Sequence, residues 1–210
     1  MCSGTAMLDA GLDLALGGAA RTVCYVEREA FACALLAARM EEQALAPAPI
    51  WSDLHTFDGK PWRGLVDFIV AGYPCQPFSF AGKRGGENDP RHLWPSIARI
   101  IGEVEPFGCW FENVGGHLSL GFEQVRADLQ GLGYRTAAGL FTAEEVGAPH
   151  KRERLFILAL ADDPRRGCGE LRAASGGDGR AEQDGGEVGN AARHGGDRPH
   201  GQAGIGRGVC

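Results

Sequence analysis

The first 161 residues alternate between short apolar runs and segments with helical periodicity. The apolar runs have the length of buried strands and cover residues 22–26, 66–71, 108–111 and 155–160. The helical patterns cover residues 29–40, 92–104 and 122–132. This alternation predicts an α/β fold, with a mostly parallel sheet and helices on both faces. Ligands of such sheets bind beyond the carboxyl ends of the strands, and the unusual residues of this chain fall at those ends.

The composition changes abruptly at residue 162. The last 49 residues contain 14 glycines and no Phe, Trp or Tyr, and their large aliphatic residues are Leu171, Val188, Ile205 and Val209. Such a stretch buries too little apolar surface to offset the entropy of ordering it. We therefore expect a folded domain over residues 1–161 and a low-complexity linker or disordered tail over residues 162–210.

Hydrophobic residues make up 44% of the chain and charged residues 23%, which is ordinary for a globular protein. No apolar run approaches the length that spans a bilayer, and the N-terminus lacks the basic-then-apolar order of a secretory signal. We expect a cytoplasmic protein with no membrane partner.

Seven cysteines are scattered along the chain without a Cys-x-x-Cys pair. This spacing argues against a disulfide framework and against a structural zinc site, so we expect no metal. The net charge of −6 argues against a nucleic-acid partner, although an acidic total can hide a basic cleft.

The segment GYPCQPFS directly follows an apolar strand and contains Cys75 between two prolines. The prolines stiffen the turn, so the cysteine is presented at the end of the strand, where a nucleophile would be placed. The alternative is a buried cysteine in a tight turn. The glycine-rich polar segment 80–91 that follows could serve as a lid.

Glu112, Asn113 and Val114 also follow an apolar strand. If the two strands are neighbours, the Glu112 carboxyl group lies beside Cys75 and could donate a proton to a ring nitrogen. Alternatively, Glu112 or Asn113 simply caps the following segment.

A basic run, PHKRER, precedes the last strand of the domain. Arg152 and Arg154 would point the same way on an extended segment and could hold a base and a phosphate together. The alternative is a solvated charge run.

Near the start, the small residues from Ser3 to Met7 precede a helix-like run, a common place for a cofactor. Glu27 and Asp53 end two further segments, where carboxylates can bind ribose hydroxyls and an adenine amine. Either could equally be a helix or turn cap.

In their order, these segments resemble the DNA cytosine-5 methyltransferase family of phages and restriction–modification systems. The matching residues run from 2 to 160: Gly4, Glu27, Asp53, Pro74-Cys75-Gln76, Glu112-Asn113-Val114 and Arg152/Arg154. The resemblance implies a Rossmann-like methyltransferase domain that binds S-adenosyl-L-methionine and methylates carbon 5 of cytosine in double-stranded DNA. It also implies a monomer, and a restriction endonuclease can accompany such an enzyme in the same system.

The resemblance further implies a role for each matching residue. Cys75 would attack carbon 6 of a flipped-out base, and Glu112 would protonate, or hydrogen-bond to, ring nitrogen 3. Arg154 would bind the base oxygen or support the covalent intermediate, and Arg152 would help to order the site. The cofactor would be bound by Ser3, Gly4, Thr5, Ala6, Met7, Glu27, Arg28, Asp53, Leu54 and Pro74. The substrate would be bound by Pro74, Gln76, Ser79, Asn113 and Val114.

The chain also departs from the family pattern. Cys2 and Ala6-Met7 stand where the family has a phenylalanine and two glycines, which restricts the backbone near the cofactor, and His150 stands where glutamine is usual. The family's first strand and its target-recognition domain are not visible, so we expect a chain truncated at both ends. Three alternatives stay open: an inactive remnant, a related transfer-RNA cytosine-5 methyltransferase and, less favoured, a small-molecule methyltransferase.

Overall fold

The computed structural model describes residues 1–74, 93–163, 165–166 and 207–209. Of the last segment, only the backbone is described. The helices are α1 (Met7–Ala15), α2 (Ala30–Glu41), α3 (Trp94–Val104), α4 (His117–Leu120) and α5 (Phe122–Gly131), with 3₁₀ turns η1 (Lys60–Trp62) and η3 (Glu144–Val146). The strands are β1 (Ala20–Thr22), β2 (Tyr25–Val26), β3 (Ile50–Trp51), β4 (Phe68–Ala71), β5 (Gly108–Val114), β6 (Tyr134–Thr142), β7 (Glu153–Ala161) and β8 (Arg207–Val209).

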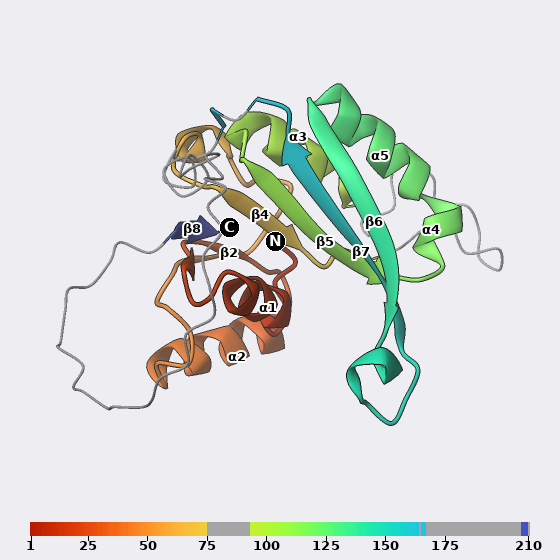
Figure 1. Cartoon of the computed structure of the whole chain (residues 1–210). Helices are drawn as coiled ribbons and strands as arrows, with labels where there is room; N and C mark the ends of the chain where they lie inside the picture. The colour runs from red at the N-terminus through yellow and green to blue at the C-terminus, as the bar shows by residue number, and fades with distance from the viewer. Residues whose placement is uncertain (75–92, 164, 167–206, 210) are drawn as a thin grey trace, which may run out of the picture.

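A six-stranded sheet has the order β1-β8-β4-β5-β7-β6, and β2 pairs with β3 in a separate two-stranded sheet. The pairs from β1 to β5 are parallel, as is β2–β3, whereas β7 runs antiparallel to both β5 and β6. The turn between β6 and β7 projects beyond the end of β5 (Figure 1). The predicted α/β class with a mostly parallel sheet is confirmed.

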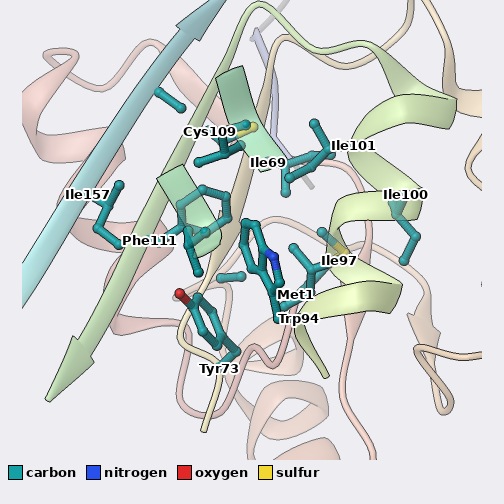
Figure 2. Close-up of a cluster of buried hydrophobic side chains, with 14 of the residues drawn as sticks. Met1, Ile69, Tyr73, Trp94, Ile97, Ile100, Ile101, Cys109, Phe111 and Ile157 are labelled. Carbon is teal, nitrogen blue, oxygen red and sulfur yellow. The ribbon is translucent and has the colours of Figure 1, made fainter. Parts of the chain in front are cut away.

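One face of the sheet is covered by α3 and α5 (Figure 1). The apolar side of α3 supplies Ile97, Ile100 and Ile101, which are 0–1% exposed. They pack in one cluster with strand residues such as Phe111 and Ile157 (Figure 2). This closed core fixes the strands β4, β5 and β7, and with them the side chains at their ends.

The other face of the sheet is covered in part by α1. Leu8 and Leu12 of this helix pack against the cluster around Phe68 and Val70. Further along the same face, Trp110 stacks on Phe156 with ring centroids 5.7 Å apart. The helices therefore lie on both faces, as predicted, but they cover the two faces unequally.

Several boundaries and elements differ from the sequence prediction. The expected strand over 22–26 is divided between β1 and β2, which belong to different sheets. β6 was not predicted, because its sequence YRTAAGLFT has few large apolar residues and an edge strand needs few. β8 was not predicted either: residues 207–209 were assigned to the tail, yet they form a strand between β1 and β4. Among the described residues, no helix has the length and apolar character needed to cross a membrane.

Candidate active site

The register between β4 and β5 brings two predicted segments together. Ala71 pairs with Phe111, so the Gly72–Pro74 segment leaves its strand beside Glu112. A Cβ added at Gly72 would lie 3.7 Å from Glu112 Oε2 and 4.0 Å from the Cys2 carbonyl oxygen. The two strands are therefore neighbours, as the candidate chemistry requires. Cys75, Gln76 and Ser79 themselves lie outside the described residues, as does the expected lid.

Glu112 is held by an ion pair with Arg154 across the β5–β7 strand pair. Arg154 Nε lies 2.7 Å from Glu112 Oε1, and the two side chains are 24% and 30% exposed. The register that pairs Val114 with Arg154 brings these side chains together. The ion pair fixes one carboxylate oxygen, and Gly72 is adjacent to the other, Oε2. Glu112 therefore pairs with Arg154 and lines the larger cavity, and its described contacts include no cap of the following segment.

Arg152 does not lie on an extended segment. Its φ is +30°, so the chain turns sharply just before β7 begins at Glu153. The expectation that Arg152 and Arg154 lie together on an extended segment is therefore wrong, because Arg152 precedes the strand and its backbone is not extended. Both side chains nevertheless line one cavity, together with Glu112.

Asn113 anchors the backbone that leads to Cys75. Its side chain is 2% exposed, and its Nδ2 donates a hydrogen bond of 3.0 Å to the Tyr73 carbonyl oxygen. The Tyr73 hydroxyl is in turn hydrogen bonded to His117 Nε2 at 3.0 Å, and burial lowers the pKa of His117. Asn113 thus links the ends of β4 and β5, whereas Val114 is 45% exposed.

The turn before α1 contains two residues with left-handed backbone that are not glycine. Cys2 and Ala6 have φ values of +48° and +58°, and Gly4 has +49°. A left-handed conformation costs an L-residue about 1–2 kcal/mol. Two of the three positions where the chain departs from the expected motif, Cys2 and Ala6, therefore carry backbone strain. The turn is stabilised by Glu27, whose Oε2 accepts a 2.8 Å hydrogen bond from Gly4 N.

A cavity of about 210 Å³ lies between this turn and the ends of β2 and β3. Five of the predicted cofactor residues line it: Glu27, Arg28, Asp53, Leu54 and Pro74. Cys2, Val26, His55 and Leu93 complete the lining and were not predicted. Cys2, Val26 and His55 directly adjoin predicted site residues in the sequence, which is the signal that could have found them, whereas Leu93 lies in the predicted helix 92–104 and carries no such signal.

A second cavity, of about 840 Å³, borders α1 and the open face of the sheet. It is lined by the predicted residues Ser3, Gly4, Thr5, Met7, Glu112, Arg152 and Arg154, and also by Cys2. Cys2 lines both cavities, so the two meet at the first turn. Ala6 is 1% exposed and lines neither. The apolar wall formed by Trp110, Phe156 and Leu158 was not predicted as part of the site.

Two adjoining cavities thus lie beside the end of β4 and the turn before α1. The Glu112–Arg154 pair lines the larger of them. The sequence model of the C-5 cytosine-specific DNA methylase family matches residues 1–174. The chain therefore belongs to this family of DNA cytosine-5 methyltransferases.

Similar characterised proteins are type II methyltransferases of bacterial restriction–modification systems. M.NgoMIV of Neisseria gonorrhoeae is 32% identical over 145 residues, which are 67% of this chain and 45% of that protein. M.AplI of Arthrospira platensis is 41% identical over 96 residues, which are 44% of this chain and 28% of that protein. The chain thus spans less than half the length of these relatives.

Solved structures support the fold. The Dnmt2 methyltransferase of S. pombe superposes with a TM-score of 0.63 and 23% identity over 77% of this chain and 49% of that one. An E. coli prophage-encoded putative DNA modification methyltransferase gives a TM-score of 0.53 at 23% identity, over 66% of this chain and 40% of that one.

Proposed function

We propose that the chain transfers a methyl group from S-adenosyl-L-methionine to carbon 5 of cytosine in DNA, through a covalent Cys75 adduct with a flipped-out base. The observation that carries the proposal is the Glu112–Arg154 pair beside Gly72. Both side chains line the larger cavity, and Gly72 lies between Glu112 and the carbonyl group of Cys2, the residue at which the two cavities meet.

Glu112 and Cys75 would activate the base together. Carbon 5 of cytosine is a poor nucleophile until electrons are added to the ring. Attack of the Cys75 thiolate forms a bond to carbon 6, and the displaced electron pair is accepted at nitrogen 3, which Glu112 protonates. Carbon 5 then takes the methyl group. Loss of the carbon-5 proton to water restores the double bond between carbons 5 and 6 and expels the Cys75 thiolate, and nitrogen 3 returns its proton to Glu112.

Arg154 would orient Glu112 for this step. It holds Oε1 at 2.7 Å, so Oε2 stays directed to the side of Gly72, which precedes Cys75 by three residues in the sequence. A charge-assisted hydrogen bond of this length restricts the carboxylate more than a neutral partner would. When the base enters, the other guanidinium nitrogens of Arg154 can also contact the base oxygen.

The carboxylates of Glu27 and Asp53 fit S-adenosyl-L-methionine, which would supply an electrophilic methyl group. A carboxylate has about four acceptor positions. Glu27 uses three of them, for the backbone N–H groups of Gly4, Arg28 and Glu29. One position on Oε2 is left for a ribose hydroxyl. Asp53 Oδ1 accepts His55 N at 2.9 Å, and its Oδ2 accepts no hydrogen bond from the described residues, so it can receive the adenine amine.

DNA is the proposed polymer despite the net charge of −6. His150, Lys151 and Arg152 are exposed in the segment that leads into β7, and Arg152 lines the larger cavity. Lys151 and Arg152 place positive charge beside the site, where a phosphate would bind. The acidic total therefore does not exclude a local phosphate-binding surface.

The test is methyl transfer from radiolabelled S-adenosyl-L-methionine to mixed-sequence duplex DNA, with transfer RNA as a parallel substrate. We expect incorporation into DNA that Cys75→Ser abolishes and that Glu112→Gln lowers about 10²–10⁴-fold. The control is Glu123→Gln, which removes a carboxylate from an exposed ion pair with Arg126 on α5 and leaves activity unchanged. Incorporation into transfer RNA alone, or DNA methylation that survives Cys75→Ser, would contradict the proposal.

A further inference from the structure

One side of α3 carries three polar side chains outside the hydrophobic core. Ser96, Arg99 and Glu103 are spaced i, i+3 and i+7, so they form one stripe along the helix. The core side of the same helix carries Ile97, Ile100 and Ile101. Such a stripe is usually a solvated surface, but here all three side chains bind the segment 53–59.

Arg99 is the centre of these contacts. Its Nη1 donates to the Phe57 carbonyl oxygen at 3.0 Å, and its Nη2 donates to the carbonyl oxygens of Leu54 at 3.2 Å and His55 at 3.3 Å. Ser96 Oγ is hydrogen bonded to His55 Nδ1 at 2.8 Å. One guanidinium thus binds three carbonyl groups of a segment that contains no helix or strand.

Glu103 completes the stripe. It accepts the Gly59 N–H at 2.9 Å and pairs with Arg99 at 2.8 Å. Partial burial alone would raise the pKa of Glu103, but the hydrogen bonds from Arg99 and Gly59 outweigh it and hold that pKa below its usual value. The carboxylate form therefore persists, and it keeps the guanidinium directed toward the segment.

The bound segment forms one wall of the smaller cavity. Asp53, Leu54 and His55 line that cavity, while the side chains of Leu54 and Phe57 are buried, with 6% and 3% exposed. Their burial fixes where the segment lies, and the Arg99 hydrogen bonds fix the orientation of its peptide groups. That orientation decides where the Asp53 carboxylate points.

We propose that Arg99 is a positioning residue for the cofactor: with Ser96 and Glu103 it sets the segment that would bind the adenosine end. This inference rests on the proposed function, because it assigns an adenosine-bearing ligand to the smaller cavity. Arg99 does not line that cavity and acts through Leu54 and His55.

Arg63 offers a matched control. Its guanidinium also binds backbone carbonyl groups near α3, with hydrogen bonds of 2.9 Å to Glu103 O and 3.1 Å to Gly102 O. It forms an ion pair with Glu105 as well. These partners lie at the C-terminal end of α3, and the described contacts of Arg63 include none with residues 53–59.

The experiment measures binding of S-adenosyl-L-homocysteine by calorimetry to the 210-residue chain, to Arg99→Gln and to Arg63→Gln. We expect the dissociation constant to rise roughly tenfold for Arg99→Gln and less than about twofold for Arg63→Gln. Hydrogen exchange of the unliganded chain should be faster at residues 54–59 in Arg99→Gln alone. With turnover, KM for the cofactor should rise while kcat stays within about twofold.

Arg99→Lys keeps the charge opposite Glu103 but loses the planar fork, so its affinity should lie between the other two values. If Arg99→Gln does not fold, Arg99→Lys gives the same comparison. If the Arg99 variant and the Arg63 variant bind S-adenosyl-L-homocysteine with equal dissociation constants, the role of Arg99 is overturned and the proposed function still stands. A wild-type chain that does not bind S-adenosyl-L-homocysteine would overturn the proposed function, and this role of Arg99 with it.

Discussion

The strands β5 and β7 and the segment 1–59 position their functional residues by different means. β5 and β7 are seven and nine residues long, and Glu112 meets Arg154 because a continuous antiparallel register brings them together. In the segment 1–59 the strands have two or three residues each. There Glu27 and Asp53 accept backbone N–H groups, and Arg99 binds the carbonyl groups of the segment.

This difference has an energetic consequence. The geometry of the Glu112–Arg154 pair depends on the packed core under the strands, so it should persist until the whole domain unfolds. The geometry of the segment 1–59, where the cofactor is proposed to bind, depends on single polar contacts, each worth about 0.5–3 kcal/mol. Substitutions there should act locally, on ligand affinity more than on global stability.

The largest effect is expected for Ile157→Ala. Ile157 of β7 is 0% exposed in the core under α3 and α5, so the substitution should lower the free energy of unfolding by about 2–5 kcal/mol. Urea denaturation measures this change. The control Val146→Ala, at a side chain that is 85% exposed, should change it by less than about 0.5 kcal/mol. A loss below about 1 kcal/mol for Ile157→Ala would contradict the dependence on core packing.

Gly108→Ala tests the start of β5. A Cβ there would overlap the ring of Phe68, which is 7% exposed and packed edge-on against Phe107. We expect a loss of about 1–3 kcal/mol in the free energy of unfolding. Gly116→Ala has open space around its Cβ and should be nearly neutral. Equal stability of the two variants in thermal melts would show that the contact is not rigid.

Glu27→Gln tests the cofactor side. The new amide group would place a donor opposite backbone N–H groups that now donate to the carboxylate, at a cost of about 1–2 kcal/mol. The expected result is weaker binding of S-adenosyl-L-homocysteine, about tenfold, and faster hydrogen exchange confined to the first turn. Glu41→Gln, exposed at the end of α2, is the control. Faster exchange that extends into β5 and β7 would contradict the separation of the two regions.

The smallest effect is expected for Gln43→Gly. Gln43 follows α2, is exposed and has a φ of +60°, a conformation that glycine adopts without strain. The substitution should stabilise the chain by about 0.5–1 kcal/mol. The neighbouring control, Glu42→Gly, has a φ of −73° and should destabilise it by a similar amount. Two changes of the same sign in the melting temperature would refute this explanation.

The same contrast explains what could be predicted from the sequence. Strand ends were predictable, because apolar runs mark β4, β5 and β7. The polar residues directly follow the runs of β4 and β5 and directly precede that of β7. That reasoning placed Glu112 beside the end of β4, and the register agrees. β6 and β8 were not predictable, because the edge strand β6 needs few apolar residues and the partners of the short strand β8, β1 and β4, lie far away in the sequence.

The polar contacts were harder to predict. Arg99 reads as the solvated side of an amphipathic helix, and nothing local in the sequence shows that three carbonyl groups of another segment lie within its reach. The φ of Arg152 could not be predicted either, because a basic run before a strand does not reveal at which residue the extended backbone begins. The missing glycine at Ala6, by contrast, was visible as a departure from a glycine motif, and its φ of +58° is a conformation that glycine adopts without strain.

The central claim is that Glu112 and Cys75 act on one base. The most direct measurement is a covalent adduct with a mixed-sequence duplex in which the cytosines carry fluorine at carbon 5. Because fluorine cannot leave as a proton does, the reaction should stop with the base attached. We predict a denaturation-resistant adduct, in the presence of S-adenosyl-L-methionine, on the peptide that contains Cys75, and a strong reduction in Glu112→Gln. An adduct on another cysteine, or no adduct from a folded chain that binds the cofactor, would contradict the claim.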